Sequence, residues 1–429
     1  MLRNKPNVIR IQNLKLKFLI LFAIRRLISA NSAKVTNQRH RKMPLPPTFD
    51  LDPLELNSDP YPVLRKMQKQ APIAFVPALD AILITRRNDI FQLEKKVDVF
   101  SSVQPDGLMT QLMGQNMMRK DGAEHLQERK AIFPTVSPKS VQTVWRQTFI
   151  NATKNILARI RPSSVSDLVQ DFAMPVSAEA LISMTGLNNM SWQEMDRVSQ
   201  GMIDGCANYA GNPVVEKRCV DCTTSIDDHI DERIKSGFSE NDLSLIAVQL
   251  RAGLSLDQTK ANIKLAISGG QNEPRDAIAG IVWALLEHPN HFSALKSGAL
   301  NFLQVFEEYC RWISPIGMSP RRVAKPYDYK KLHFRTNDRV FFMFGAGNRD
   351  EEVFENPDIF DPYQDSAKSI AFGAGPHFCA GAWASRCLIA EVALPMLLAR
   401  FANLKIAGEV KFSGWAFRGP IAVPVKWDS

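Results

Sequence analysis

A single cysteine on a glycine-supported loop, Cys379, is the feature that most restricts how this chain can fold. It lies in the run Phe372-Gly-Ala-Gly-Pro-His-Phe-Cys-Ala-Gly381, directly before a predicted helix at 380–399. The two glycines inside the run permit a sharp turn where a side chain would collide with a flat macrocycle. Backbone N–H groups beyond the sulfur and the positive end of the following helix favour the thiolate. The loop therefore suits a thiolate ligand to haem iron.

Two other interpretations of this loop stay open from these residues alone. Glycine-rich loops that enter helices often bind phosphate. A lone cysteine is most often a small buried hydrophobe. The choice between them depends on motifs elsewhere in the chain.

Several such motifs occur in a fixed order before and after the cysteine. Glu308 and Arg311 are spaced to pair on one helix face. The other motifs are Asp121-Gly-Ala-Glu-His-Leu-Gln-Glu-Arg-Lys130, Trp312-Ile-Ser-Pro-Ile-Gly-Met-Ser-Pro-Arg-Arg322, Gly347-Asn-Arg-Asp350, Phe354-Glu-Asn-Pro-Asp-Ile-Phe-Asp361 and Phe417-Arg-Gly-Pro-Ile-Ala-Val-Pro-Val425. In this order and spacing the series resembles the cytochrome P450 superfamily of haem-thiolate monooxygenases, of the soluble bacterial type. The resemblance covers roughly residues 44–428.

The resemblance implies a cofactor, haem b (iron protoporphyrin IX), with Cys379 as the iron ligand. It also implies that the haem propionates are bound by a set of donors from four places in the chain, namely His125, Arg129, Arg321 and His377, with Arg322 as the fallback for Arg321. The implied reaction inserts one atom of O2 into a small, hydrophobic organic substrate. The two electrons come from a ferredoxin and a ferredoxin reductase with NAD(P)H, because the chain ends soon after the C-terminal hairpin and no donor module is expected to be fused.

Composition and pattern predict a mainly α fold with a small β lobe, the cytochrome P450 fold. The chain is 45% hydrophobic, and no Pro/Gly/Ser-rich linker interrupts residues 50–429. Residues 44–429 are therefore expected to form one haem domain. Strands are predicted at 73–75, 81–85, 339–344 and 421–425, where short apolar runs occur, and long helical patterns fill the middle.

The long helix predicted at 257–288 departs from the family pattern at the point where it crosses the haem. Most members read Ala-Gly-x-acid-Thr-Thr there, whereas this chain reads Gly269-Gly-Gln-Asn-Glu-Pro274. Pro274 cannot donate to the carbonyl of Gly270, so the helix is expected to kink or widen. Glu273, with its pKa raised by burial, is predicted to be the proton donor, with Asn272 holding a water beside it. The alternative is that both side chains only satisfy a broken helix.

A second departure is Ile359, where many relatives have Arg or His. Without that third partner, the pair formed by Glu308 and Arg311 must find a backbone carbonyl or another group.

The basic charge of the chain belongs to its N-terminal part. Residues 1–49 contain eleven Lys or Arg and no acid, and the remainder is close to neutral. This distribution argues against a nucleic-acid surface on the folded body. The apolar stretch at 18–24 is far shorter than the ~20 residues that span a bilayer, so no transmembrane span is expected. Residues 1–43 are interpreted as a basic extension, and three origins stay open: a membrane-surface helix, an organelle presequence, or a misassigned start ahead of Met43.

The six cysteines are scattered, which indicates a reducing compartment and a cytoplasmic location. Cys219 and Cys222 have the spacing of a metal knuckle, but no second Cys or His pair completes a tetrahedral site. These two cysteines are therefore interpreted as structural.

Two alternative functions stay open: a peroxide-using, isomerase or dehydratase type of haem-thiolate enzyme, and a haem-binding sensor without turnover. Substrate contacts are expected from the Met-rich segment 101–118 and from 202–222, although both segments are equally compatible with plain core. An acidic ferredoxin is expected to dock near Cys379 on four basic residues, Arg119, Lys120, Lys130 and Arg386.

Overall fold

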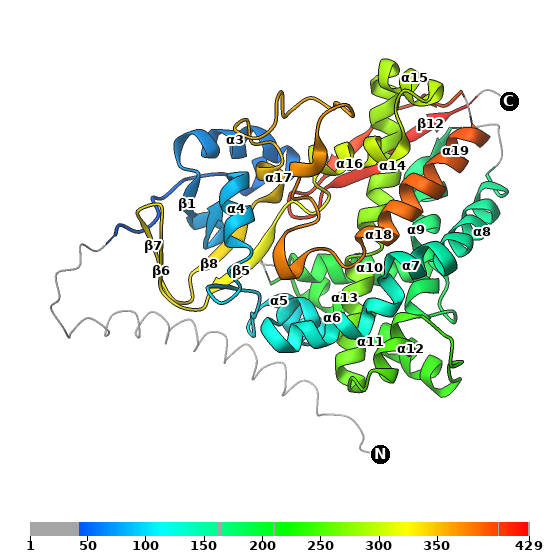
Figure 1. Cartoon of the computed structure of the whole chain (residues 1–429), viewed down its shortest axis with the longest axis horizontal. Helices are drawn as coiled ribbons and strands as arrows, with labels where there is room; N and C mark the ends of the chain where they lie inside the picture. Colours follow the sequence, from blue (N-terminus) through cyan, green and yellow to red (C-terminus); the bar gives the residue numbers. More distant parts are fainter. Residues whose placement is uncertain (1–42, 161–164, 209–210, 402, 428–429) are drawn as a thin grey trace. The chain divides into compact units, whose positions relative to one another are not determined.

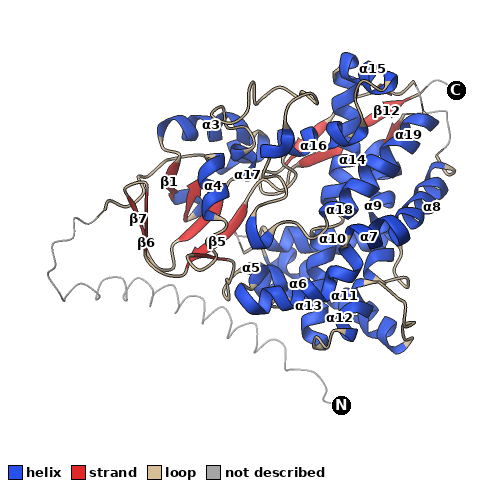
Figure 2. Cartoon of the chain, viewed as in Figure 1, coloured by secondary structure: helices blue, strands red, loops and turns tan. Residues whose placement is uncertain are grey.

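The computed structural model describes residues 43–160, 165–208, 211–401 and 403–427. Contacts divide the chain into two units, Met1–Pro44 and Leu45–Ser429. The predicted basic extension and its apolar stretch at 18–24 lie outside the described residues. The second unit is mostly helical, with one group of strands in a smaller lobe and further strands, including β12, beside the helices (Figure 2). This agrees with the predicted fold class.

The small lobe is built on a five-stranded sheet with the order β1-β2-β8-β5-β3. Its strands are β1 (Ile73–Val76), β2 (Ala81–Ile84), β3 (Phe100–Ser101), β5 (Ser319–Val323) and β8 (Arg339–Phe342). The β2–β8 pair is parallel and the other pairs are antiparallel. Branched and aromatic residues of this sheet form one apolar core with α4 (Arg87–Leu93). Three of the four predicted strands are thereby confirmed.

The fourth predicted strand, 421–425, is divided in the structure. β11 (Gly419–Ala422) pairs with β10 (Lys411–Ser413), whereas β12 (Pro424–Lys426) pairs with β4 (Ser166–Asp167) and β9 (Lys405–Ile406). A separate hairpin joins β6 (Tyr327–Tyr329) and β7 (Leu332–Phe334).

Helices make up the larger part of this unit (Figure 1). Two of them are α2 (Pro53–Ser58) and α3 (Pro60–Gln70). Each follows an aspartate N-cap and has a proline in its first turn. The others are α5 (Leu108–Met113), α6 (Gly122–Val136), α7 (Pro138–Ser140), α8 (Arg146–Leu157), α9 (Met174–Thr185), α10 (Trp192–Cys206), α11 (Pro213–Lys235), α12 (Leu245–Arg251), α13 (Leu256–Ser268), α14 (Asn272–Glu287), α15 (Pro289–Ser297), α16 (Phe302–Ile313), α17 (Phe344–Gly347), α18 (Ala382–Arg386) and α19 (Leu394–Arg400).

The main core forms around α14 and the π-helical segment η7 (Cys387–Ala393), which joins α18 to α19. Nearly every apolar side chain of α14 is buried there against α9, α16 and η7. Within the described residues, only the stretch Ala382–Arg400 is long and apolar enough to be considered as a membrane span, and 56% of its most apolar window is buried inside the protein. That burial is typical of a core helix.

The predicted long helix at 257–288 is two helices, so the expectation of one kinked helix is wrong. α13 ends at Ser268, and α14 begins at Asn272. Pro274 is the third residue of α14, where the N–H would have no intrahelical acceptor in any case. The interruption therefore lies before the proline. It falls at the two glycines of the motif, 269 and 270, whose low helix propensity favours an end there.

The predicted pair between Glu308 and Arg311 is present and fully buried on α16. Arg311 Nε and Nη2 donate to the two carboxylate oxygens, both at 2.7 Å. The remaining guanidinium hydrogens reach three backbone carbonyls, those of Asn348, Pro357 and Ile359, at 2.8–3.1 Å. The expectation that backbone carbonyls replace the missing third side chain is confirmed.

Cys219 and Cys222 have a packing role between α10 and α11. The sulfur of Cys219 lies 2.4 Å from the position that a Cβ on Gly205 would take. The sulfur of Cys222 lies 2.4 Å from the same position on Gly201. The two helices approach closely because the glycines of α10 leave room for the thiols of α11. The described part of the chain contains no cluster of three or more His, Cys, Asp or Glu able to hold a metal ion. The packing of both thiols against these glycines supports the structural interpretation of the two cysteines.

Candidate active site around Cys379

The Cys379 loop makes the turn that its glycines predict. Gly373 and Gly375 both have positive φ, +72° and +66°. The Cys379 N–H donates to the carbonyl of Phe372 at 2.9 Å, which closes the loop. In Figure 1 this orange segment leads directly into α18. Two residues before the cysteine, His377 ends a short turn at Gly375–His377.

The Cys379 sulfur accepts a hydrogen bond from the N–H of Gly381. Burial raises the pKa of the thiol, while that hydrogen bond and the charge of Arg129 lower it. Coordination to a metal ion deprotonates a thiol outright. The N–H donor and the guanidinium are thus placed to stabilise the sulfur as a ligand.

The structure brings His125 and Arg129 of α6 to the cysteine loop. They are one helical turn apart and therefore share a face of α6. The His125 ring lies against the His377 ring, with their centroids 4.2 Å apart. Burial, followed by the charges of His377 and Arg129, lowers the pKa of His125 to about 4. His125 is therefore a neutral hydrogen-bonding group at neutral pH.

Asp121 and Ser102 form hydrogen bonds with the ring of His377. Neither is predicted as a site residue from the sequence. His377 Nε2 lies 2.9 Å from Asp121 Oδ1 and 3.1 Å from Ser102 Oγ. Burial is the largest influence on His377 and lowers its pKa, although the hydrogen bond that its ring donates to Asp121 opposes this effect. Asp121 is the first residue of the motif that contains His125, and this position is the only signal that the sequence offers for it.

Arg321 of β5 reaches the same pocket from the sheet. It is 2% exposed, and its Nη2 donates to Glu94 Oε1 at 3.2 Å. Its charge contributes to the lowered pKa of His377, which places the two groups within electrostatic reach. Arg322, the fallback, is the next residue on the strand and points to the opposite face. Arg321 is therefore the better candidate.

The residues of this pocket fit haem, because some of their hydrogen-bond donors have no partner in the part of the protein that the structure describes. Arg321 Nε is buried and has no hydrogen-bond partner among the described residues. Burial lowers the pKa of Arg129 while the charge of Cys379 raises it, and Arg129 forms no ion pair within the described part of the chain. Buried guanidinium groups require anionic partners. Two propionates would meet that requirement beside the sulfur.

Glu273 lies in the first turn of α14. Its charge raises the pKa of Cys379, so the two groups lie within electrostatic reach of each other. Neither carboxyl oxygen has a hydrogen-bond partner among the residues described. Burial raises the pKa of Glu273 to about 8, with a further contribution from Asp276. The predicted upward shift is present in the structure.

Asn272 is turned toward α10. Its Oδ1 accepts from Ser199 Oγ and its Nδ2 donates to Gln200 Oε1, both at 3.4 Å. These contacts tie the first turn of α14 to α10. The predicted role of Asn272 in holding a water for Glu273 stays a prediction.

Comparison with known proteins adds independent evidence. The family model described as cytochrome P450 matches residues 299–410, which include Glu308, Arg311 and Cys379. Pulcherriminic acid synthase of Bacillus subtilis (strain 168) is 22% identical over 87% of this chain and 96% of the relative. Cytochrome P450 107B1 of Saccharopolyspora erythraea is 26% identical over 82% of this chain and 91% of the relative.

Solved structures agree on the fold. P450BioI in complex with a ligated acyl carrier protein has a TM-score of 0.78 at 20% identity, covering 86% of this chain and 99% of that one. CYP109E1 from Bacillus megaterium in complex with testosterone has a TM-score of 0.78 at 19% identity, covering 86% and 98%. The chain belongs to the cytochrome P450 superfamily. This P450 accordingly uses haem as its cofactor, and it is an oxidoreductase of the monooxygenase class.

Two of the four residues expected to dock an electron donor on this P450 are buried. Arg119 is 6% exposed and Lys120 is 7% exposed. Lys120 forms a buried ion pair with Glu128. These two assignments are wrong, because both side chains fold inward beside α6. Lys130 is exposed, and Arg386 is half-buried in an ion pair with Glu307.

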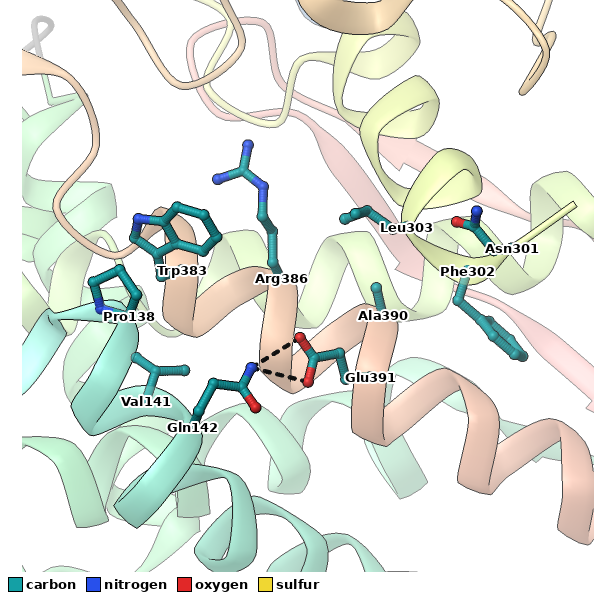
Figure 3. Close-up of a pocket in the computed structure, with 10 residues that line it drawn as sticks. All are labelled: Pro138, Val141, Gln142, Asn301, Phe302, Leu303, Trp383, Arg386, Ala390 and Glu391. Atoms are coloured by element: carbon teal, nitrogen blue, oxygen red, sulfur yellow. Dashed lines mark hydrogen bonds between the residues drawn. The ribbon is translucent and has the colours of Figure 1, made fainter.

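A groove of about 360 Å³ lies beside Arg386, on the outer side of the helix that follows the cysteine loop (Figure 3). Its walls come from α7, the π-helical segment η3 (Val141–Trp145), the start of α16, and α18 with η7. Gln142 and Glu391 bond across its floor at 3.0 Å. Trp383, four residues after the cysteine, is 53% exposed at its edge. This P450 therefore presents a mixed apolar and charged surface close to Cys379.

Proposed function

We propose that this P450 inserts one atom of O2 into a small, hydrophobic organic substrate and takes its electrons from a separate ferredoxin-type partner. The observation that carries the proposal is the buried, unpaired carboxyl of Glu273, within electrostatic reach of Cys379. Haem bound through a cysteine thiolate supplies O2 binding and O–O cleavage. Of the remaining requirements, protons and a dry site come from the protein, and electrons come from the partner.

Glu273 holds the proton. With a pKa of about 8, its carboxyl is mostly protonated at neutral pH and is able to donate. Aspartate or glutamate with an ordinary pKa would already be ionised. The first turn of α14 keeps this side chain in place through the contacts of Asn272 with α10.

Electrons must come from outside the pocket, because a monooxygenase consumes two per turnover. The cysteines other than Cys379 are free thiols, four of them buried, and burial raises the pKa of each. Such thiols are poor electron donors, since the thiolate is the reactive form. Six free cysteines also support a reducing compartment, and we place this P450 in the cytoplasm.

The substrate is expected to contact the segments around α5 and α10. Met113, Met117 and Met202 are buried there in one apolar cluster with Ile263 and Ile267 of α13. Methionine side chains adapt to irregular shapes, which suits a hydrophobic ligand.

The test is turnover with isotopically labelled dioxygen and a ferredoxin, a ferredoxin reductase and NADPH. We expect one labelled oxygen atom in the product for each pair of electrons used. Product formed equally well from peroxide without the partners would favour the peroxide-using alternative. Spectral shifts with ligands and no product across a broad compound library would favour a sensor.

Removal of residues 1–42 is expected to leave folding and haem binding unchanged. Unit Leu45–Ser429 contains the whole site and its own cores. A chain that starts at Met43 should therefore match the full chain in thermal midpoint and in the amount of haem bound per protein. A loss of either would show that the extension contributes to the fold.

Added salt is expected to slow reduction by an acidic ferredoxin. Lys130 is the exposed candidate contact on α6, and opposite charges chiefly raise the rate of encounter. Lys130→Glu should lower the second-order rate of reduction and flatten its salt dependence. The matched control is Lys235→Glu, which reverses an exposed lysine at the end of α11. Equal effects of the two variants would exclude Lys130 as a docking residue.

A further inference from the structure

Apart from Glu273, whose raised pKa of about 8 keeps it mostly protonated at neutral pH, the pocket around Cys379 holds as many carboxyl groups as guanidinium groups. Arg129 and Arg321 are its two guanidinium cations, while Asp121 bonds His377 and Glu94 bonds Arg321. The positive charge of a ferric porphyrin core is cancelled by its thiolate ligand. The two propionates would then add negative charge to a set that is already balanced. Burying unbalanced charge is costly, so a proton has to be taken up.

Glu94 is the carboxyl whose position suits that proton. It follows α4 directly and is 1% exposed. Oε2 accepts from the N–H of Ala374 at 2.8 Å, inside the cysteine loop, and Oε1 accepts from Arg321 Nη2. A Cβ on Gly373 would stand 3.3 Å from the same carboxyl. Glu94 therefore joins the loop that carries the iron ligand to the arginine predicted to bind a propionate.

We infer that Glu94 holds a proton when haem is bound, so that Arg321 can serve a haem propionate and haem retention becomes proton-coupled. A charged Glu94 competes with the propionate for Arg321, whose Nε is left without a partner among the described residues. A neutral Glu94 still accepts the hydrogen bond from the N–H of Ala374. It no longer holds the guanidinium of Arg321 with a full negative charge. The inference rests on the proposed haem pocket.

Glu273, with a pKa of about 8, also titrates in the relevant pH range, whereas three other groups of the pocket titrate below it. The pKa values of His125, His377 and Asp121 are all lowered. Burial raises the pKa of Glu94 to about 7, against the opposing charge of Arg321. A nearby propionate would raise it further. As the pH rises through this range, Glu94 loses its proton and haem is held less tightly.

The experiment measures haem loss from the ferric holoprotein to a haem-scavenging apoglobin between pH 6.5 and pH 9. We expect the rate to rise with pH, approaching at most about tenfold per pH unit, as for one linked proton. Glu94→Gln keeps the size and the acceptor for Ala374 but cannot ionise, so its rate at high pH should be slower than that of the unmodified protein and should depend less on pH. Asp89→Asn is the control, because Asp89 is a buried carboxyl on α4 that bonds Tyr329 instead.

A flat profile for the unmodified protein would overturn the inference, and so would a Glu94→Gln variant with the original pH dependence. If Glu94→Gln does not fold, the Glu273→Gln variant decides, because Glu273 no longer contributes a carboxylic acid there. Its infrared spectrum should still contain the C=O band of a buried protonated carboxylic acid, and that band should fade over the pH range in which haem loss accelerates. Failure of the haem pocket itself would be seen separately, as the absence of a thiolate-type spectrum at every pH.

Discussion

Replacement of Cys379 by alanine is expected to abolish thiolate-ligated haem. The loop places this sulfur, and no other cysteine of the described chain, beside Arg129 and the N–H of Gly381. The measurement is the absorption spectrum of the reduced, carbon-monoxide-bound protein, in which a thiolate ligand gives a strongly red-shifted Soret band. The variant should lack that band completely, and any haem that remains should be released easily.

The matched control is Cys387→Ala. Cys387 is fully buried on η7 and follows the same loop, but it packs in the apolar core. Its loss should cost some stability, on the order of 1 kcal/mol for a small cavity, and leave the Soret band in place. A red-shifted band in Cys379→Ala would mean that the iron ligand has been assigned to the wrong residue.

Replacement of Glu273 by glutamine is expected to uncouple electron use from product formation. Glutamine keeps the size and the hydrogen-bonding capacity of the side chain but removes the acid. Loss of a general acid typically lowers the rate by ~10²–10⁴-fold. NADPH should still be consumed through the partners, while peroxide accumulates in place of oxygenated product. The measurement is product and peroxide formed per NADPH.

Glu287→Gln serves as the control, because Glu287 ends the same helix and is exposed. It should match the unmodified protein in coupling. If Glu273→Gln also matched it, Glu273 would be a structural residue of the helix start, and the protons would have to arrive through ordered water.

The pattern of residues predicted the chemistry of the site better than the shape of its helices. The glycine turn before Cys379 and the pairing of Glu308 with Arg311 depend on residues a few positions apart, so local rules were sufficient. The division of the predicted helix at 257–288 was only partly foreseen. The expectation placed the distortion at Pro274, whereas two glycines end the first helix and the proline fits the first turn of the next.

The burial of Glu94 could not be predicted from its neighbours in the sequence. This residue stands in the run Leu93-Glu-Lys-Lys96, whose charges suggest a solvated surface. Its burial arises because β5 and the cysteine loop, more than 200 residues away in the chain, close over it. Arg119 and Lys120 were misjudged for the same reason. Basic side chains next to a recognised motif were assumed to face solvent, and tertiary contacts turned them inward.

The contacts of Arg311 explain how much sequence change this architecture can absorb. Its guanidinium donates hydrogen bonds to the backbone carbonyl oxygens of Asn348, Pro357 and Ile359. Every residue type has such an oxygen. The side chain of Ile359 is itself 56% exposed. Side chains between Asn348 and Ile359 can therefore be substituted while the backbone of this segment, which leads to the cysteine loop, stays bound to Arg311. An anchor that recognises main chain instead of side chains allows a protein only 20% identical to P450BioI to retain its fold at a TM-score of 0.78.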